Sequence, residues 1–249
     1  MIRDLRTILE GWDFEPGKIS VRKIIGCDGR EKIQTRIDLG VLQLECAGRP
    51  DGARPHGYPC LLDYHDERLR RHTETAGDDD DFVLSSEDCR ALRHEAYLYY
   101  QRYLSLFVLE EFDGVERDTA RNLRVIDLCA RYGATEQDRT LLQQQRGYVL
   151  MMHTRACAYL ALARKQPDAA LTLVEKGLAD LEALCGGDGE ERWANEISTL
   201  ETLRREVLEK LPDNAPVKLK SELEWAVAME DYERATELRD RLERTRSEG

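Results

Sequence analysis

Amphipathic segments with helical spacing fill the chain from residue 86 to residue 211, and they constrain its fold more than any other feature. The segment RALRHEAYLYYQRYLSLFVLEEF places apolar residues on one broad face, namely Leu92, Ala96, Tyr100, Tyr103, Leu104 and Phe107. A spacing of three to four residues predicts helices that bury one face against each other. With short links between the segments, the sequence predicts a bundle of helical hairpins.

Proline and glycine mark where these helices are expected to begin and end. One helix is predicted to end at Gly133, and one long helix is predicted over residues 138–166, bounded by Pro167. The next helix starts at Pro167 and is predicted to end at the pair Gly186 and Gly187.

About one repeat of this zone resembles a tetratricopeptide repeat. Ala158 and Ala170 fall on the small positions of its two helices, and Val174 falls on a large apolar position. Comparable small residues at Ala120, Ala170 and Ala235 lie 50 and then 65 residues apart, so no steady period runs along the chain. The resemblance implies TPR-like helical hairpins.

Residues 18–46 show the two-residue period of strands. In the run over residues 31–39, Ile33, Thr35, Ile37 and Leu39 alternate with polar side chains. Asp28-Gly29 precedes this run and predicts a tight hairpin turn, since glycine tolerates a positive φ. With residues 41–46 as a third run, we predict a three-stranded antiparallel meander whose apolar face needs cover. The expected fold class is α+β, mainly α.

Four zones follow along the chain. We predict a β-meander domain with an exit helix over residues 1–72, the exit helix starting near Pro59. The acidic stretch TETAGDDDDF has little to bury and predicts a linker or exposed loop over residues 73–85. Polar helix-start signals from Ser85 to Asp88 open the helical-hairpin bundle over residues 86–211. A last hairpin is predicted over residues 217–246.

Composition narrows the class of function. The formal charge of −12 makes nucleic-acid binding unlikely, because a grip on phosphates needs clustered Lys and Arg. Apolar runs such as residues 148–152 are too short to span a membrane, and MIRDLRTILEGWDF has no apolar signal segment, so we expect a cytoplasmic protein. Seven cysteines without a CxxC pair argue against a disulfide framework and a zinc ribbon, and most are expected to be small buried apolar residues or surface thiols.

The C-terminal segment after the hinge at residues 212–216 carries two apolar stripes. Leu219, Leu223, Ala226 and Val227 form the first stripe, and Tyr232, Ala235, Leu238 and Leu242 form the second. Their spacing predicts two short helices closed into an antiparallel hairpin, with Asp231 as N-cap of the second. A hairpin of this size buries little area alone, so we expect it to recruit a surface from its own chain or from a partner.

The same segment resembles the UVR motif, the UvrB/UvrC helical hairpin. The resemblance rests on Asp231-Tyr232-Glu233-x-Ala235 followed by Leu238-Arg239-Asp240, with Leu219, Leu223 and Ala226 on the first helix; Thr236 departs from the usual second small residue. It implies a protein–protein docking module and does not imply enzymatic activity, so we expect neither an enzyme nor a cofactor. The partner, another protein or a second copy, would be bound by Leu223, Tyr232, Ala235, Leu238, Arg239 and Asp240.

Other candidate sites are weaker. The Gly/Pro-rich loop at residues 48–59 is either a rigid connector or an anion or ligand site formed by Arg49, Arg54 and His56. Cys60, Asp63, His65 and His72 do not converge in spacing, so we expect no metal site. The tyrosines at 97, 99, 100 and 103 either stack on bases or line a groove or, more simply, pack in a core helix buried on two sides.

Three functions remain in view. The first is a non-enzymatic adaptor or regulator that docks another protein through the C-terminal hairpin, with Tyr232, Leu238 and Arg239 at the contact. The second is an accessory factor of nucleotide-excision repair that uses the same hairpin. The third is a ligand-binding protein or small enzyme working at the loop of residues 48–59.

Overall fold

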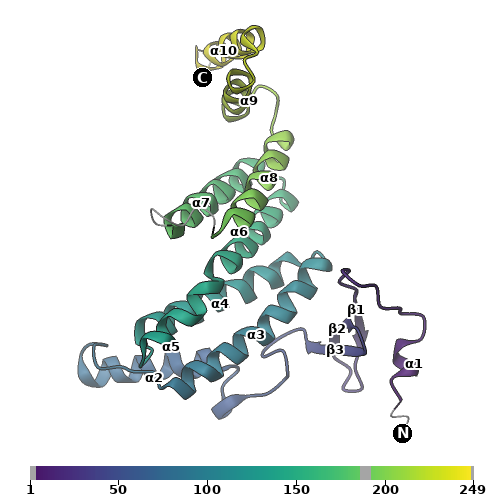
Figure 1. Ribbon diagram of the computed structural model, residues 1–249, viewed down its shortest axis with the longest axis vertical. Coiled ribbons are helices and arrows are strands. Elements are labelled where there is room, and N and C mark those ends of the chain that lie inside the picture. Colours follow the sequence, from purple (N-terminus) through teal and green to yellow (C-terminus); the bar gives the residue numbers. More distant parts are fainter. Residues whose placement is uncertain (1–3, 186–191, 248–249) are drawn as a thin grey trace. The chain divides into compact units, whose positions relative to one another are not determined.

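The computed structural model describes residues 4–185 and 192–247, and these residues are mainly helical, with an antiparallel sheet near the N-terminus (Figure 1). The predicted α+β, mainly α class is confirmed. The chain divides into two compact units, residues 1–156 and residues 157–249. The division falls inside helix α6 (Arg146–Ala163). The predicted domain limits at residues 72/73, 85/86 and 211/217 stay predictions.

The sheet of the first unit is the predicted meander. Strands β1 (Val21–Ile25), β2 (Glu31–Ile37) and β3 (Gly40–Glu45) pair antiparallel in the order β1-β2-β3. Gly29, in the turn between the first two strands, has a φ of +74°. Ile33 lies opposite Leu44, and both are buried. The apolar face is shorter than expected, because Leu39 lies in the turn after β2 and is 87% exposed.

The other face of β2 is also covered, by its own cross-strand neighbours. Lys32 is buried and its ammonium pairs with Asp28 at 2.7 Å and with Glu45. Gln34, also buried, accepts a hydrogen bond from Arg22 at 2.9 Å and donates one to Gln43 at 3.0 Å. Long polar side chains therefore satisfy one another across the strands and shield this face.

Some helices of the first unit begin and end where the proline, glycine and polar residues predict. The unit's helices begin with the short α1 (Arg6–Leu9), the 3-10 turn η1 (Pro55–Gly57), α2 (Leu61–Ala76), α3 (Ser86–Val108) and α4 (Phe112–Tyr132). Helix α3 begins with a capping box in which Ser85 and Asp88 each accept a hydrogen bond from the other's backbone N–H, as the polar start signals predict.

The single helix predicted over residues 138–166 is wrong in its first part. The chain forms α5 (Glu136–Thr140), then the 3-10 helix η2 (Leu141–Gln145), and only then α6. Thr135 caps α5 by accepting a hydrogen bond from Asp138 N. The tighter 3-10 turns place Leu142 in the hydrophobic core, where it is 3% exposed.

The acidic stretch is anchored more firmly than a free linker. Helix α2 extends to Ala76, and the following Asp78, Asp80 and Asp81 are exposed. Phe82 and Leu84, however, are buried in the core of the first unit. Leu84 N donates to Tyr132 O at 2.8 Å, so the end of this stretch is tied to the end of α4.

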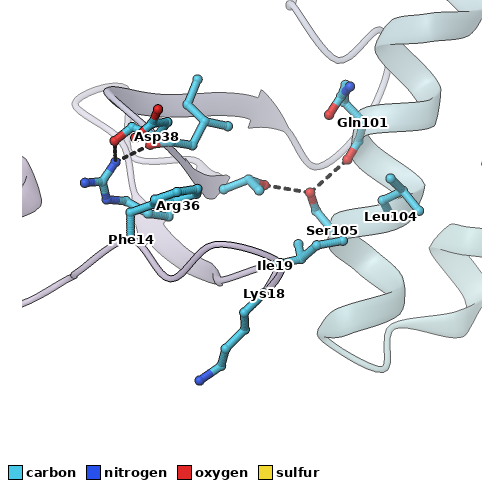
Figure 2. A pocket seen from close by; sticks show the side chains of 11 residues that line it. Phe14, Lys18, Ile19, Arg36, Asp38, Gln101, Leu104 and Ser105 are labelled. Atoms are coloured by element: carbon cyan, nitrogen blue, oxygen red, sulfur yellow. Dashed lines mark hydrogen bonds between the residues drawn. The ribbon is translucent and has the colours of Figure 1, made fainter.

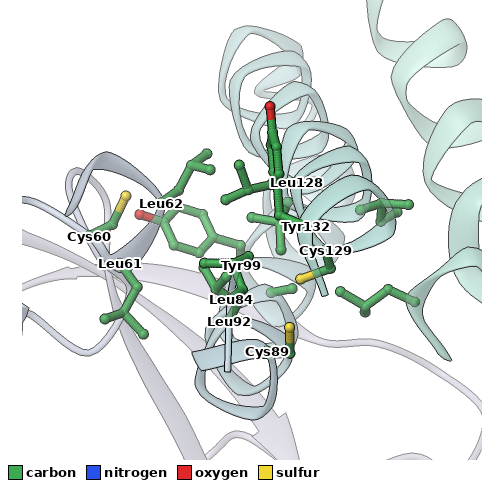
Figure 3. Packing of buried hydrophobic residues seen from close by; sticks show 14 of the residues in the cluster. Cys60, Leu61, Leu62, Leu84, Cys89, Leu92, Tyr99, Leu128, Cys129 and Tyr132 are labelled. Carbon is green, nitrogen blue, oxygen red and sulfur yellow. The ribbon is translucent and has the colours of Figure 1, made fainter. Parts of the chain in front are cut away.

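The core of the first unit lies where α2, α3 and α4 meet (Figure 3). Leu62, Leu92, Tyr99 and Leu128 belong to it, from all three helices. Cys60, Cys89 and Cys129 are buried there, which confirms the expectation for these three cysteines. Cys27 is exposed, and Cys46, Cys157 and Cys185 are intermediate.

The second unit contains the end of α6 and helices α7 (Pro167–Cys185), α8 (Ala194–Lys210), α9 (Pro216–Ala228) and α10 (Tyr232–Ser247). Helix α7 packs against α8, and α9 against α10. The predicted end of α7 at Gly186 and Gly187 lies outside the described residues. The tetratricopeptide resemblance stays a prediction.

Three helix–helix turns share one geometry. Glu110 after α3, Lys165 after α6 and Glu230 after α9 are left-handed, with φ of 58°, 60° and 60°. In each turn the N–H of the next residue donates to the carbonyl five positions earlier, as from Asp231 to Ala226 at 2.9 Å. This is the Schellman arrangement, here built without glycine. A new helix follows almost at once, and since α3 packs against α4 and α9 against α10, the turns at Glu110 and Glu230 produce helical hairpins.

Candidate functional site

The C-terminal hairpin of α9 and α10 is the candidate site. Pro216 stands in the first turn of α9, where its missing N–H costs no hydrogen bond. Asp231 Oδ1 accepts a hydrogen bond from Arg234 N at 3.1 Å, so it caps α10 as predicted. The Schellman turn at Glu230 reverses the chain between the two helices. The predicted helical hairpin is confirmed.

The apolar stripes of the two helices close on each other. One cluster contains the buried side chains of the hairpin, namely Leu219, Ala226, Ala235, Leu238 and Leu242, with Leu223 packed against it. The small side chains of Ala226 and Ala235 sit in this contact at 0% and 8% exposure. The stripe therefore forms the hairpin's own core.

A different set of apolar residues is exposed around the turn. Trp225 in the last turns of α9 is 66% exposed, Met229 at its end 62%, and Tyr232 at the start of α10 67%. Val227 and Tyr232 are both expected on the buried stripes, and the exposure of Val227, at 52%, and of Tyr232 corrects that expectation. Sequence reasoning named Tyr232 but missed Trp225 and Met229. For Trp225 the available signal was its helical phase, since it lies off the stripe defined by Leu219, Leu223 and Ala226; Met229 follows the last residue of α9.

Charged side chains of the hairpin remain on its surface. Arg239 pairs with the adjacent Asp240 at 3.1 Å, and both side chains are about half exposed. Arg234 on α10 lies 3.6 Å from Glu222 on α9 and links the two helices. Exposed pairs of this kind contribute about 0–1 kcal/mol each. Their charges thus stay available to a binding partner.

The hinge at residues 212–216 is tied to both helices. Lys218 Nζ on α9 pairs with Asp213 at 2.7 Å and donates to Leu211 O at 3.2 Å. Arg241 on α10 donates to Asp213 O at 2.9 Å. The hydrogen bond from Lys218 lowers the pKa of the Asp213 carboxyl below its usual range.

The predicted partner-binding residues thus fall into two groups. Ala235 and Leu238 are buried within the hairpin and Leu223 is partly buried, whereas Tyr232 and Arg239 are exposed and Asp240 is intermediate. A role in binding stays a prediction for all six, but only the second group presents side chains to a partner.

Arg49 of the loop at residues 48–59 turns inward. Its Nε lies 3.4 Å from Glu95 Oε1 on α3, a carboxylate with no exposed surface. Glu95 also accepts a hydrogen bond from Leu61 N at 2.8 Å and pairs with Arg121 of α4. Arg49 therefore belongs to a buried network that fixes the loop and the start of α2 to the bundle.

Arg54 and His56 do not join Arg49. Arg54 donates to Gly57 O within its own loop at 3.3 Å. His56 is left-handed, with a φ of 51°, and its ring stacks on Tyr64 at 4.1 Å. These contacts favour the rigid-connector interpretation of the loop, and the ligand site there stays a prediction.

The four residues considered as metal ligands lie in different environments. Cys60 and His65 are buried, while Asp63 is exposed. His72 packs edge-on against Phe82 at 5.6 Å. Among residues 4–185 and 192–247, no three His, Cys, Asp or Glu side chains are placed to hold a metal ion.

Comparison with known proteins gives one match. The family model described as the UvrB/uvrC motif (UVR) matches residues 217–248, the segment of the hairpin. No curated protein and no solved structure matches the chain. Within the described part of the chain, no helix is long and apolar enough to cross a membrane. The UVR resemblance is thereby confirmed for the C-terminal segment and extends to no other part.

Proposed function

We propose that this chain is a non-enzymatic adaptor or regulator that binds another protein through its C-terminal hairpin. One observation carries the proposal: the hairpin buries its aliphatic stripe internally and still exposes Trp225, Met229 and Tyr232 around its turn. Large aromatic side chains contribute much of the binding energy in protein interfaces, and water-exposed ones contribute little to the fold.

The two groups of hairpin residues would then have different tasks. Tyr232 and Trp225 would be the anchors that enter pockets on the partner, and Arg239 with Asp240 would supply charge selectivity at the rim. Leu238 and Ala235 would act by holding the two helices at the spacing that presents those anchors.

The test compares three forms of the full chain as bait in cell lysate: the unchanged protein, the double variant Trp225→Ser/Tyr232→Ser, and the control Leu39→Ser. Leu39 is also an exposed apolar residue, at 87%, but lies in the sheet turn of the first unit. We expect a specific partner to be lost from the hairpin variant and retained by the control. Retention of every partner by the hairpin variant, with its helicity intact, would overturn the proposal.

A partner in nucleotide-excision repair is the more specific alternative. It is supported by the match to the UvrB/uvrC motif, which covers the hairpin. With a formal charge of −12, contact with a repair protein is favoured over contact with DNA. The identity of the captured partner decides between repair and another regulatory process, and a cytoplasmic location is part of both proposals.

A further inference from the structure

A cavity of about 450 Å³ lies in the first unit, far along the sequence from the hairpin (Figure 2). Three segments line it: the N-terminal segment before β1, the end of β2 with the turn after it, and the C-terminal third of α3. Its apolar walls come from Phe14, Ile19, Ile37 and Leu104. Ile19 and Ile37 are 47% and 48% exposed, so the apolar lining continues to the surface and leaves an open mouth.

The two cations beside the cavity hold their charges away from its inner wall. Lys18 pairs with Glu15 at 3.1 Å, and its ammonium points away from Leu104 and Ser105 in Figure 2. Arg36 donates from Nε to Trp12 O and from Nη1 to Asp38 O, each at 3.0 Å. Its guanidinium lies on the side remote from Ser105 (Figure 2). An anionic ligand would therefore gain little charge pairing inside the cavity.

A chain of hydroxyl groups lies in the lining between the sheet and α3. Thr35 Oγ1 and Ser105 Oγ are 2.7 Å apart, and Ser105 Oγ donates to Gln101 O at 2.8 Å (Figure 2). Since the Ser105 proton goes to Gln101 O, Thr35 is the donor to Ser105. Both hydroxyl protons are used, and what remains on Thr35 is the capacity to accept a hydrogen bond.

We propose that this cavity binds a small neutral aromatic or aliphatic molecule that carries one hydroxyl or N–H group. The apolar body packs against Phe14, Ile19 and Leu104, and the donor group bonds to Thr35 Oγ1. Apolar walls with one placed polar group are typical of small-molecule sites. An anionic ligand is disfavoured because it loses water while Lys18 and Arg36 hold their charges away from the inner wall, and a cationic ligand finds only the exposed carboxylate of Asp38, whose charge water screens.

The test uses the full chain and four probes of matched shape: 4-propylphenol, 4-propylanisole, 4-propylbenzoate and 4-propylbenzylammonium. Calorimetry and amide chemical shifts report affinity and location. The phenol is expected to bind saturably, with a Kd on the order of 0.1–1 mM and shifts centred on the cavity. The methyl ether should bind about three- to tenfold more weakly, because it has no proton to donate. Both charged probes should bind more weakly than the ether.

Two variants make the outcome decisive. Thr35→Val keeps the side-chain shape and removes the acceptor. The affinity for the phenol should therefore fall to that for the ether, while the affinity for the ether stays unchanged. Thr75→Val, at an exposed threonine of α2, should change neither. Ile19→Asp, at the partly exposed mouth, should weaken both probes and remains informative if Thr35→Val unfolds the sheet. Equal binding of benzoate and phenol, or an unchanged phenol-to-ether ratio in Thr35→Val, would overturn the proposal.

Discussion

Arg102 on α3 and Asp118 on α4 form a buried, two-pronged ion pair. Arg102 Nε lies 2.7 Å from Asp118 Oδ2, and Nη2 lies 2.8 Å from Oδ1. Their side chains are 1% and 0% exposed. Arg102 Nη1 also donates to Glu45 O at 3.0 Å and to Gly48 O at 2.7 Å. One guanidinium therefore joins the two helices and fixes the end of β3 against them.

Breaking this pair from one side should be costly. We expect Asp118→Leu to lower the free energy of unfolding by about 3–5 kcal/mol, because the Arg102 charge stays buried without its partner. Urea unfolding followed by circular dichroism measures the loss. The control Asp66→Leu removes the more exposed pair with Arg124, at 2.9 Å, and should cost about 1 kcal/mol or less. The double variant Arg102→Met/Asp118→Leu should be more stable than Asp118→Leu, because no unpaired charge remains buried. If the two variants lost the same free energy of unfolding, the buried charge would not be the cause.

His65 should make stability depend on pH. Burial lowers the pKa of His65 to about 4 from the usual 6.5, and Asp88, whose carboxylate is 3.9 Å away, acts in the opposite direction. Arg68 Nη1 lies 3.0 Å from Nδ1, a contact that suits a neutral ring. The unfolded chain binds the proton at higher pH than the folded chain. The contribution of neutral His65 to the free energy of unfolding is thus complete above pH 6.5. It falls by up to about 3 kcal/mol as the pH decreases from about 6.5 to about 4.

The measurement for His65 is a difference between two pH profiles. Urea midpoints of the unchanged protein and of His65→Leu are compared between pH 4 and pH 8, so that the common titration of carboxylates cancels. The His65→Leu profile should be flatter between pH 4 and pH 6.5. His94→Leu, at an exposed histidine of α3, serves as control and should follow the unchanged protein. A His65→Leu profile of the same slope would show that His65 is not the titrating group.

Glycine at a left-handed turn position should increase the stability of the protein. Lys165 has a φ of 60°, a conformation that costs a residue with a Cβ roughly 1 kcal/mol and costs glycine almost nothing. We expect Lys165→Gly to raise the free energy of unfolding of the second unit by about 0.5–1 kcal/mol. Lys176→Gly, at an exposed position inside α7, should lower it by about 1 kcal/mol. Thermal unfolding compares the two, and destabilisation by both would refute the turn assignment.

Leu238 should act through the hairpin core. It is 1% exposed within the cluster formed by α9 and α10. Leu238→Ala is expected to cost about 2–4 kcal/mol, enough to melt a hairpin of this size. Helicity should fall and proteolysis should cut within residues 217–246, while the first unit stays resistant. Tyr232→Ser should leave helicity and resistance unchanged. A folded Leu238→Ala hairpin would mean that Leu238 does not support the structure.

Elements with local signals were predictable from the sequence. The meander follows from alternation and from Asp28-Gly29, and the start of α3 follows from the pairing of Ser85 with Asp88. Gly133 ends α4 as expected, but its φ of −60° does not require glycine. Glycine is needed there because a Cβ would lie 2.7 Å from Cys129 O. The turns at Glu110 and Glu230 lack glycine, so their left-handed conformation had no composition signal.

The exposure of the candidate site was not predictable in the same way. The period of α9 places Leu219 on one apolar stripe and the period of α10 places Leu238 on another, and a stripe alone does not say what covers it. In the structure the two stripes cover each other, and Trp225, off the stripe, is left to water.

By itself, the sequence determined the meander, the C-terminal hairpin and the helices other than the broken stretch before α6, because capping, turn geometry and periodicity act between residues a few positions apart. Only the tertiary structure decided that Arg49 faces Glu95, that Arg102 meets Asp118, and that Thr35 meets Ser105 beside a cavity. In the order given, these pairs are 46, 16 and 70 positions apart in the sequence. They depend on how whole elements pack, and no local pattern encodes the partner that a buried polar side chain will find.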